Sequence, residues 1–196
     1  MRRIWFTSDI HIDHTNVVHL SNRPFSNVQE MEKTIIDNIN KRVKAEDVLY
    51  ILGDVCLGKK ESWVRFLDSL VCRNVVLVIG NHDKWNSIPK DKIILIADVI
   101  RLRMFHKAIL LSHYPYRCSW FRALWKRLHP AVLSKKRPKD TGLWLLHGHD
   151  HRKTQLCDYH PRQINVGVDA NNFKPISGEE IISIIQRQES TFKTGL

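Results

Sequence analysis

Residues 4–11 read Ile-Trp-Phe-Thr-Ser-Asp-Ile-His, an apolar and β-branched run that leads into a carboxylate and an imidazole. Such a run, without polar alternation, is typical of a strand buried inside a covered sheet. The pattern recurs four more times along the chain, at residues 48–52, 75–79, 108–111 and 143–146. Each run is followed within two residues by Asp, Asn or His. Because the carboxyl ends of strands gather at one edge of an open α/β sheet, we expect these polar side chains to meet there.

Amphipathic helices are expected between and after these strands. The first spans about residues 27–44, where apolar side chains recur every four residues and Ser26 with Gln29 forms a capping box. A second helix is predicted at residues 61–70. A third, at 179–186, follows a Ser177/Glu180 box, although its Ile-rich stretch could equally be a strand. Alternation of strands and helices favours the α/β class.

Length and composition favour one domain covering residues 1–196. The longest apolar stretches are far shorter than the roughly 20 residues that cross a bilayer, so no transmembrane segment is expected. The first residues lack the apolar core of an export signal. The four cysteines form no C-x-x-C pair, which suits a reducing cytoplasm and excludes cysteine-rich zinc motifs. The net charge of +11 favours an anionic partner or substrate.

The polar residues that follow the strands are metal-ligand types. A single Asp or His after a strand is ordinary loop chemistry, but here the donors number at least seven: Asp9, His11, Asp54, Asn81, His113, His149 and His151. One ion takes roughly four to six ligands including water, so the set predicts two ions. Residues two apart in extended chain point to the same side, which would bring Asp9 together with His11, and His149 with His151.

The donor chemistry narrows the choice of metal and reaction. Carboxylate, amide and imidazole ligands without thiolate favour Mn, with Fe, Zn, Ni or Mg as alternatives. Two divalent ions about 3.5–4 Å apart are a known device for hydrolysis at phosphorus, because they generate a hydroxide and stabilise the added negative charge. We therefore expect two divalent metal ions and a phosphoester substrate.

These residues resemble the calcineurin-like metallophosphoesterases. The family motifs stand in order as Asp9-x-His11, Gly53-Asp54, Gly80-Asn81-His82-Asp83, His113 and Gly148-His149-x-His151. The resemblance implies a four-layer α/β/β/α sandwich of two mixed sheets flanked by helices. It also implies that Asp9, His11, Asp54 and His151 hold one metal. Asp54 would bridge to a second metal, which Asn81, His113 and His149 complete.

The resemblance also implies catalytic roles beside the metals. His82 would contact the phosphate and act as general acid or transition-state stabiliser, and Asp83 would orient the His82 ring. A finer likeness is to small stand-alone bacterial and phage phosphoesterases, which carry D-x-H-x-x-H, R-x-F and N-V-G-V-D motifs. It suggests His14 and Arg23 as phosphate-side contacts, and structural or supporting roles for Asn165 and Asp169.

Two departures from the wider superfamily affect this interpretation. The Ser/Thr protein phosphatases carry G-D-x-x-D-R-G, whereas residues 53–58 read Gly-Asp-Val-Cys-Leu-Gly, which argues against protein phosphatase activity. Asp150 adds a charge between His149 and His151, where a small residue is common; a solvent-facing carboxylate is the favoured interpretation. His147 has the opposite strand phase from His149 and is expected in the core or supporting a ligand.

Residues 117–139 form a basic, aromatic insertion between two of the site segments. The stretch holds eight Lys or Arg and no Asp or Glu, leaving a net +3 for the rest of the chain. Residues 119–129 could form a helix with an apolar stripe. This stretch could be a helix packed on the core, a flap that binds nucleotide or single-stranded nucleic acid, or a peripheral membrane contact.

The sequence thus predicts a cytoplasmic, two-metal phosphoesterase that cleaves phosphoester bonds by attack of a metal-bridging hydroxide. Phosphodiesters of nucleotides or nucleic acids are favoured, because the basic insertion could hold the second substituent. The alternatives are a phosphomonoesterase, a hydrolase of lipid-linked pyrophosphates, or a nucleic-acid-binding module with the same fold.

Overall fold

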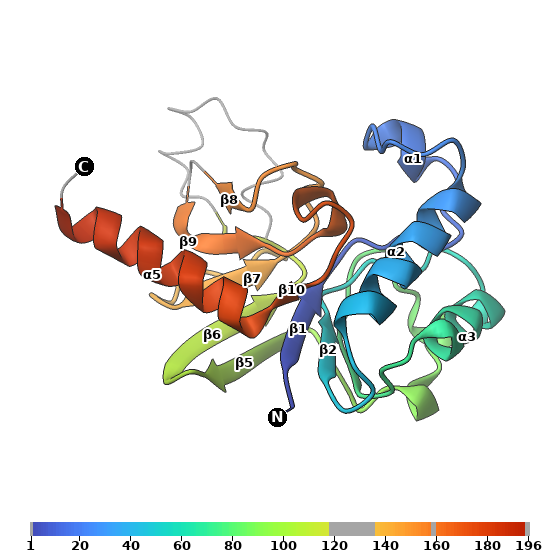
Figure 1. Ribbon diagram of the computed structural model, residues 1–196, viewed down its shortest axis with the longest axis horizontal. Helices are drawn as coiled ribbons and strands as arrows, with labels where there is room; N and C mark the ends of the chain where they lie inside the picture. Colours follow the sequence, from blue (N-terminus) through green and yellow to red (C-terminus); the bar gives the residue numbers. More distant parts are fainter. Residues whose placement is uncertain (1, 118–135, 158–159, 195–196) are drawn as a thin grey trace.

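Two mixed five-stranded sheets form the centre of the protein, with helices flanking them (Figure 1). The computed structural model describes residues 2–117, 136–157 and 160–194. The architecture confirms the α/β class and the two mixed sheets expected from the sequence. The helix expected at residues 119–129 lies outside the described residues.

The first sheet has the strand order β10-β1-β2-β3-β4. Its strands span Ile4–Thr7 (β1), Val48–Ile51 (β2), Val75–Val78 (β3), Leu95–Ala97 (β4) and Ile176–Ser177 (β10). Strands β1 to β4 run parallel, and β10 pairs antiparallel with β1. The parallel pairing brings the carboxyl ends of β1, β2 and β3 to one edge, as the strand pattern predicted.

The second sheet has the order β5-β6-β7-β9-β8. Its strands span Val99–Met104 (β5), Lys107–Ser112 (β6), Trp144–His147 (β7), Leu156–Cys157 (β8) and His160–Asn165 (β9). Strands β6, β7 and β9 are parallel, while β5 and β8 pair antiparallel at the two edges. The carboxyl ends of β6 and β7 therefore also lie together.

Helices α2 (Val28–Arg42) and α3 (Lys60–Ser69) pack against the first sheet. Trp5 lies in the core cluster with these helices, while its neighbour Phe6 lies in the cluster shared with the second sheet. This division follows from the two-residue period of a strand. The α2 cap differs from the expected Ser26/Gln29 box: Asn27 accepts from the Glu30 N–H at 2.9 Å, and the Glu30 carboxylate accepts from the Ser26 N–H.

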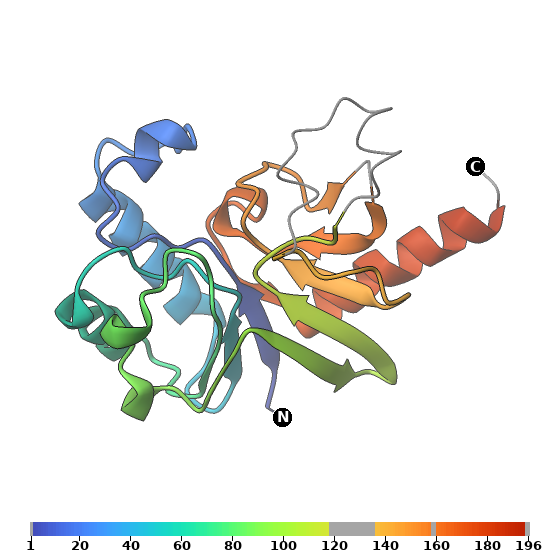
Figure 2. The ribbon, with the colours of Figure 1, turned by 180° about the vertical axis from the view of Figure 1, so that it is seen from behind.

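Helix α5 (Gly178–Thr194) lies against the second sheet, as Figures 1 and 2 show from opposite sides. Ile181, Ile184 and Ile185 join the core cluster there, so the Ile-rich stretch is helical rather than a strand. The predicted Ser177/Glu180 capping box is present: the Glu180 N–H donates to Ser177 Oγ, and the Ser177 N–H donates to the Glu180 carboxylate. The helix runs well beyond residue 186.

Short elements complete the described chain. Helix α1 (Val17–Leu20) follows the first metal-ligand motif, and 3-10 turns lie at Trp85–Ser87 (η1), Lys90–Lys92 (η2) and Val168–Ala170 (η4). Within the described ranges, no helix combines the length and the apolar character needed to span a membrane.

Candidate metal centre

The seven expected metal ligands come from the loops that follow five parallel strand ends. Asp9 and His11 follow β1, Asp54 follows β2, and Asn81 follows β3. From the second sheet, His113 follows β6, and His149 and His151 follow β7. The structure brings all seven together.

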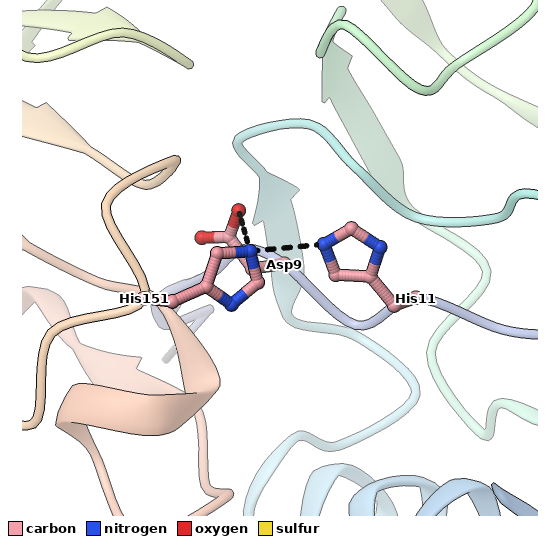
Figure 3. A group of neighbouring side chains, drawn as sticks. All are labelled: Asp9, His11 and His151. Atoms are coloured by element: carbon pink, nitrogen blue, oxygen red, sulfur yellow. Dashed lines mark hydrogen bonds and ion pairs between the residues drawn. The ribbon is translucent and has the colours of Figure 1, made fainter. Parts of the chain in front are cut away.

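A first donor group consists of Asp9, His11 and His151. One ligand atom from each lies within 4.8 Å of the other two. The Nε2 atoms of His11 and His151 face each other at 3.2 Å, and His151 Nε2 lies 4.0 Å from Asp9 Oδ1 (Figure 3). The Nε2 atoms of two neutral imidazoles at this distance need a proton or a cation between them. The arrangement therefore fits a metal ion.

A second donor group lies beside the first. Asp9, Asp54 and His113 form a set within 4.8 Å, and Asp9 is common to both groups. The Asn81 Oδ1 atom lies 3.0 Å from both His113 Nε2 and His149 Nδ1, and these two nitrogens are 3.3 Å apart. His113 Nδ1 lies 2.8 Å from the Leu52 carbonyl oxygen, a contact in which Nδ1 donates and leaves Nε2 free to accept.

Asp54 belongs to the second group and also faces the first. Its Oδ2 atom is 3.5 Å from His113 Nε2 and 3.7 Å from His11 Nε2. A buried carboxylate with imidazoles of both groups at these distances is placed to serve both. These carboxylate, amide and imidazole ligands are types that suit divalent transition metals.

Backbone geometry, rather than an extended chain, aims most of these ligands. Asp9, His11 and Asp54 have φ values of 58°, 60° and 52°, and His149 and His151 have 74° and 46°. The expectation that residues two apart would converge in extended chain is therefore corrected: they converge through left-handed backbone. This conformation costs an L residue about 1–2 kcal/mol, and such strain clusters at functional sites.

Gly53 shows why a glycine precedes Asp54. Its φ is +89°, and a Cβ there would lie 2.6 Å from His113 Nδ1 and 2.7 Å from Gly80 Cα. A side chain would therefore displace the loop after β3 or the ring of His113.

Burial sets the charge state of the donors. Burial is the largest influence on the pKa of His11, which lies far below its ordinary value, with repulsion from His151 adding to the effect. Burial, followed by the charge of His113, lowers the pKa of His149 to about 4. Burial also raises the pKa of Asp9, against the attraction of His113 and His151. The lowered pKa values of His11 and His149 favour neutral rings, which keep the lone pairs that a cation requires. Burial opposes the charged form of His151, but the hydrogen bond to Asp169 and the charge of Asp9 raise its pKa above the ordinary value.

His82 and Asp83 occupy different surroundings. The His82 side chain is 38% exposed, and its Nε2 lies 3.8 Å from Asp54 Oδ2. The Asp83 carboxylate is buried and accepts backbone N–H groups of Asp54 (2.9 Å), Val55 (2.9 Å) and Gly80 (2.8 Å). The expected role of Asp83 in orienting the His82 ring is therefore corrected: its carboxylate holds together the loops after β2 and β3.

His14 and Arg23, which were both expected to contact phosphate, lie in different surroundings. The half-buried His14 lies beside the donors, with its Nδ1 3.0 Å from His11 Nδ1 and its ring 5.8 Å from that of His82. Arg23 is only 4% exposed, and its guanidinium contacts Asp169. The structure thus places His14 toward the site and Arg23 behind it.

Asp150, the residue between the last two ligands, also differs from expectation. The Asp150 carboxylate was expected to face solvent, but its Oδ1 accepts a hydrogen bond from Arg137 Nη2 at 3.1 Å. His147 is buried, as expected, and burial is the main cause that lowers its pKa to about 4.

The contact of Ser21 Oγ with His151 Nδ1, at 3.2 Å, has no sequence signal because 130 residues separate the pair.

Comparisons relate this chain to known proteins. A family model described as calcineurin-like phosphoesterase matches residues 2–182. An uncharacterized protein of Methanocaldococcus jannaschii is 33% identical over 193 residues, covering 95% of this chain and 93% of that protein. The gene 66 protein of Mycobacterium phage L5 is 29% identical over 205 residues, covering 94% and 95%. A solved protein of unknown function from Aquifex aeolicus matches with a TM-score of 0.70 and 31% identity, over 94% of this chain and 100% of that one.

Proposed function

The chain belongs to the calcineurin-like phosphoesterase family, and we propose that it hydrolyses phosphodiester bonds with two divalent metal ions. One observation carries the proposal: Asp54 Oδ2 lies 3.7 Å from His11 Nε2 of the first donor group and 3.5 Å from His113 Nε2 of the second. A site for one ion would not need both groups.

The donor positions suggest how the ligands divide. Asp9, His11 and His151 would hold one ion, and Asn81, His113 and His149 the other, with Asp54 shared. Mn²⁺ suits this mixture of carboxylate, amide and imidazole, with Fe, Zn, Ni and Mg as the other candidates. When bound, two such ions would lower the pKa of a water molecule and offset charge on the phosphoryl oxygens.

His82 is the side chain placed to assist the leaving group. Its backbone N–H donates to Asp54 Oδ1 at 2.9 Å, which fixes the residue beside the donors while the ring stays partly exposed. An imidazole there can contact a phosphoryl oxygen and deliver a proton to the departing oxygen. His14, whose ring lies near that of His82, would contact the same phosphate.

The preference for diesters rests on the base of the 117–139 insertion. The Arg117 N–H donates to the Pro138 carbonyl at 2.8 Å, so the two ends of the insertion lie together. Arg137 then connects this base to Asp150, between two expected ligands. Cationic residues from this base would hold the second substituent of a nucleotide or a single-stranded nucleic acid. A cytoplasmic location is part of the proposal.

Paired chromogenic phosphate esters test this function. The metal-stripped protein is given Mn²⁺, Mg²⁺, Zn²⁺, Fe²⁺ or Ni²⁺ in turn, and hydrolysis of a monoester and a diester is measured. We expect metal-dependent cleavage with the diester preferred. His82→Ala should lower kcat by about 10²–10⁴-fold while bound metal is retained.

His106→Asn is the matched control, because His106 is an exposed histidine in the turn between β5 and β6, and Asn tolerates its positive φ. This variant should match the wild type. Monoester preference would overturn the diester proposal in favour of a phosphomonoesterase. Absence of metal-dependent hydrolysis of either ester would overturn the hydrolase proposal.

A further inference from the structure

We propose that Asp169 and Arg23 form a positioning pair that holds His151 in its Nδ1–H tautomer and fixes the backbone of Asp9. Both residues lie behind the first donor group and are buried, with side-chain exposures of 1% and 0%. The inference rests on the proposed function, because it takes His151 and Asp9 as metal ligands. Neither Asp169 nor Arg23 needs to touch metal or substrate.

The contact between Asp169 and His151 sets the orientation of the ring. Asp169 Oδ2 lies 2.9 Å from His151 Nδ1. In Figure 3, the opposite ring nitrogen of His151 points toward Asp9 and His11, while the nitrogen facing Asp169 points away from them. A carboxylate only accepts, so Nδ1 must carry the proton and Nε2 is left with its lone pair. Carboxylates that accept from a ligating histidine are a common way to orient it.

Arg23 fixes the carboxylate of Asp169 with a two-point contact. Its Nε donates to Oδ1 at 3.0 Å and its Nη2 to Oδ2 at 2.7 Å. The planar fork of a guanidinium matches a carboxylate in this way and holds it in one orientation. The orientation of Asp169, and through it that of His151, is therefore set by Arg23.

The same guanidinium reaches the second ligand. Arg23 Nη2 also donates to the Asp9 carbonyl oxygen at 2.8 Å, and Nη1 donates to the Ile10 carbonyl at 3.3 Å. These acceptors belong to the strained segment in which Asp9 has its positive φ. Both hydrogens of Nη2 are thus used by Asp169 and Asp9. None remains for His151 Nδ1 at 3.4 Å, which keeps its own proton.

Surrounding contacts hold the pair in place. Lys153 Nζ donates to the Ser21 carbonyl at 3.0 Å and lies 3.5 Å from Asp169 Oδ1. The chain before Arg23 is thus linked to the segment after β7 and to η4. The ion pair between Arg23 and Asp169 joins the Arg-Pro-Phe motif to the Asn-Val-Gly-Val-Asp motif, although these two residues are 146 positions apart in the sequence.

Histidine NMR on the metal-free protein tests the proposal directly. Long-range ¹H–¹⁵N spectra of ¹⁵N-histidine protein report which ring nitrogen of neutral His151 carries the proton, with the signal assigned through His151→Gln. We expect Nδ1–H in the wild type. In Asp169→Asn, Arg23 takes the single amide oxygen and the amide NH₂ faces the ring. His151 should then shift to Nε2–H, and Mn²⁺ affinity should fall about 10–100-fold.

Asp47→Asn is the matched control. Asp47 is also a buried carboxylate that accepts three donors, but it precedes β2, at the strand end opposite the donors. This change should lower stability and leave the His151 tautomer and Mn²⁺ affinity unchanged. Arg23→Lys, which keeps the charge, should retain the Nδ1–H tautomer.

Two results would overturn the positioning pair: Nε2–H in the wild type, or an Asp169→Asn protein with unchanged tautomer and Mn²⁺ affinity. If Asp169→Asn does not fold, the wild-type tautomer still decides. A wild type that binds no Mn²⁺ would overturn the proposed function instead, and the tautomer would still decide whether Asp169 orients the ring.

Discussion

At the scale of single residues, buried carboxylates have distinct tasks that residue type alone does not reveal. Asp54 Oδ2 faces imidazole nitrogens, whereas the Asp83 carboxylate accepts main-chain N–H groups at 2.8–2.9 Å. Asp169 accepts from a guanidinium. Because a carboxylate has two oxygens with several lone pairs, it can fix a loop or a side chain as well as bind a metal.

The role of Asp83 gives a prediction at this scale. In Asp83→Asn, one oxygen must replace two, and the new NH₂ group opposes backbone donors. We expect unfolding free energy to fall by about 1–3 kcal/mol in chemical denaturation. Because Asp83 acts through the loops, the Asp83→Asn substitution should also lower kcat, and by the same factor in the wild type and in His82→Ala. If Asp83 acted through the His82 ring, the double variant would be no slower than His82→Ala.

At the scale of elements, the five strands that lead into the site could be predicted to within one residue at their ends. They are short, buried runs whose pattern does not depend on distant partners. Strands β4, β5, β8, β9 and β10 could not be predicted in this way. Strand β5 alternates exposed and partly buried residues, and β8 and β10 have only two residues each, so pairing with distant strands defines them.

The candidate site also combines features that the sequence predicts with features that it does not. Its residue types and their convergence follow from the strand ends, which are local features. The left-handed backbone at Asp9 and His11, the Asp83 contacts and the Arg23–Asp169 pair depend on contacts between segments far apart in sequence. The α2 cap shifts by a single residue, from Ser26 to Asn27, and both residue types can cap a helix.

Asp47 provides a pH prediction for the first sheet. It accepts from the Arg3 N–H, the Trp5 indole and the Lys44 N–H, and so joins the starts of β1 and β2. Burial raises the pKa of Asp47, but the bonds from Lys44, Arg3 and Trp5 together lower it below its ordinary value. A lowered folded-state pKa stabilises the protein above the unfolded pKa of about 3.9, and this contribution is lost as pH falls through the folded value.

Thermal unfolding at a series of pH values measures this effect. The wild type should be more stable than Asp47→Asn at pH 7, and the gap should narrow below about pH 4. A gap that stays constant from pH 7 to pH 3 would show that the charge of Asp47 contributes nothing.

At the scale of the whole molecule, positive charge is concentrated in one insertion while the donor groups are assembled from both sheets. The 117–139 insertion joins β6 to β7, and each of these strands leads into an expected ligand. Both ends of the insertion are therefore joined to segments that carry expected ligands. The proposed function predicts that the charge of the insertion attracts a polyanionic substrate.

Salt-dependent binding of a single-stranded oligonucleotide checks the proposed role of this charge. Changing Arg122, Lys126 and Arg127 to Gln should weaken binding and reduce the slope of log K against log salt by about two. Gln at Lys41, Lys44 and Lys60, which are exposed on the first-sheet side, removes the same charge and should leave the slope nearly unchanged. Equal effects of both triple variants would contradict a local role for the insertion.

The number of divalent ions bound per chain tests the central claim most directly. The metal-stripped protein is titrated with Mn²⁺, and the bound metal is counted by calorimetry and elemental analysis. Two donor groups around Asp54 predict two Mn²⁺ per wild-type chain, and one per chain after Asn81→Ala and His149→Ala are combined. A folded wild-type chain that binds one ion or none at saturating Mn²⁺ would contradict the two-metal site.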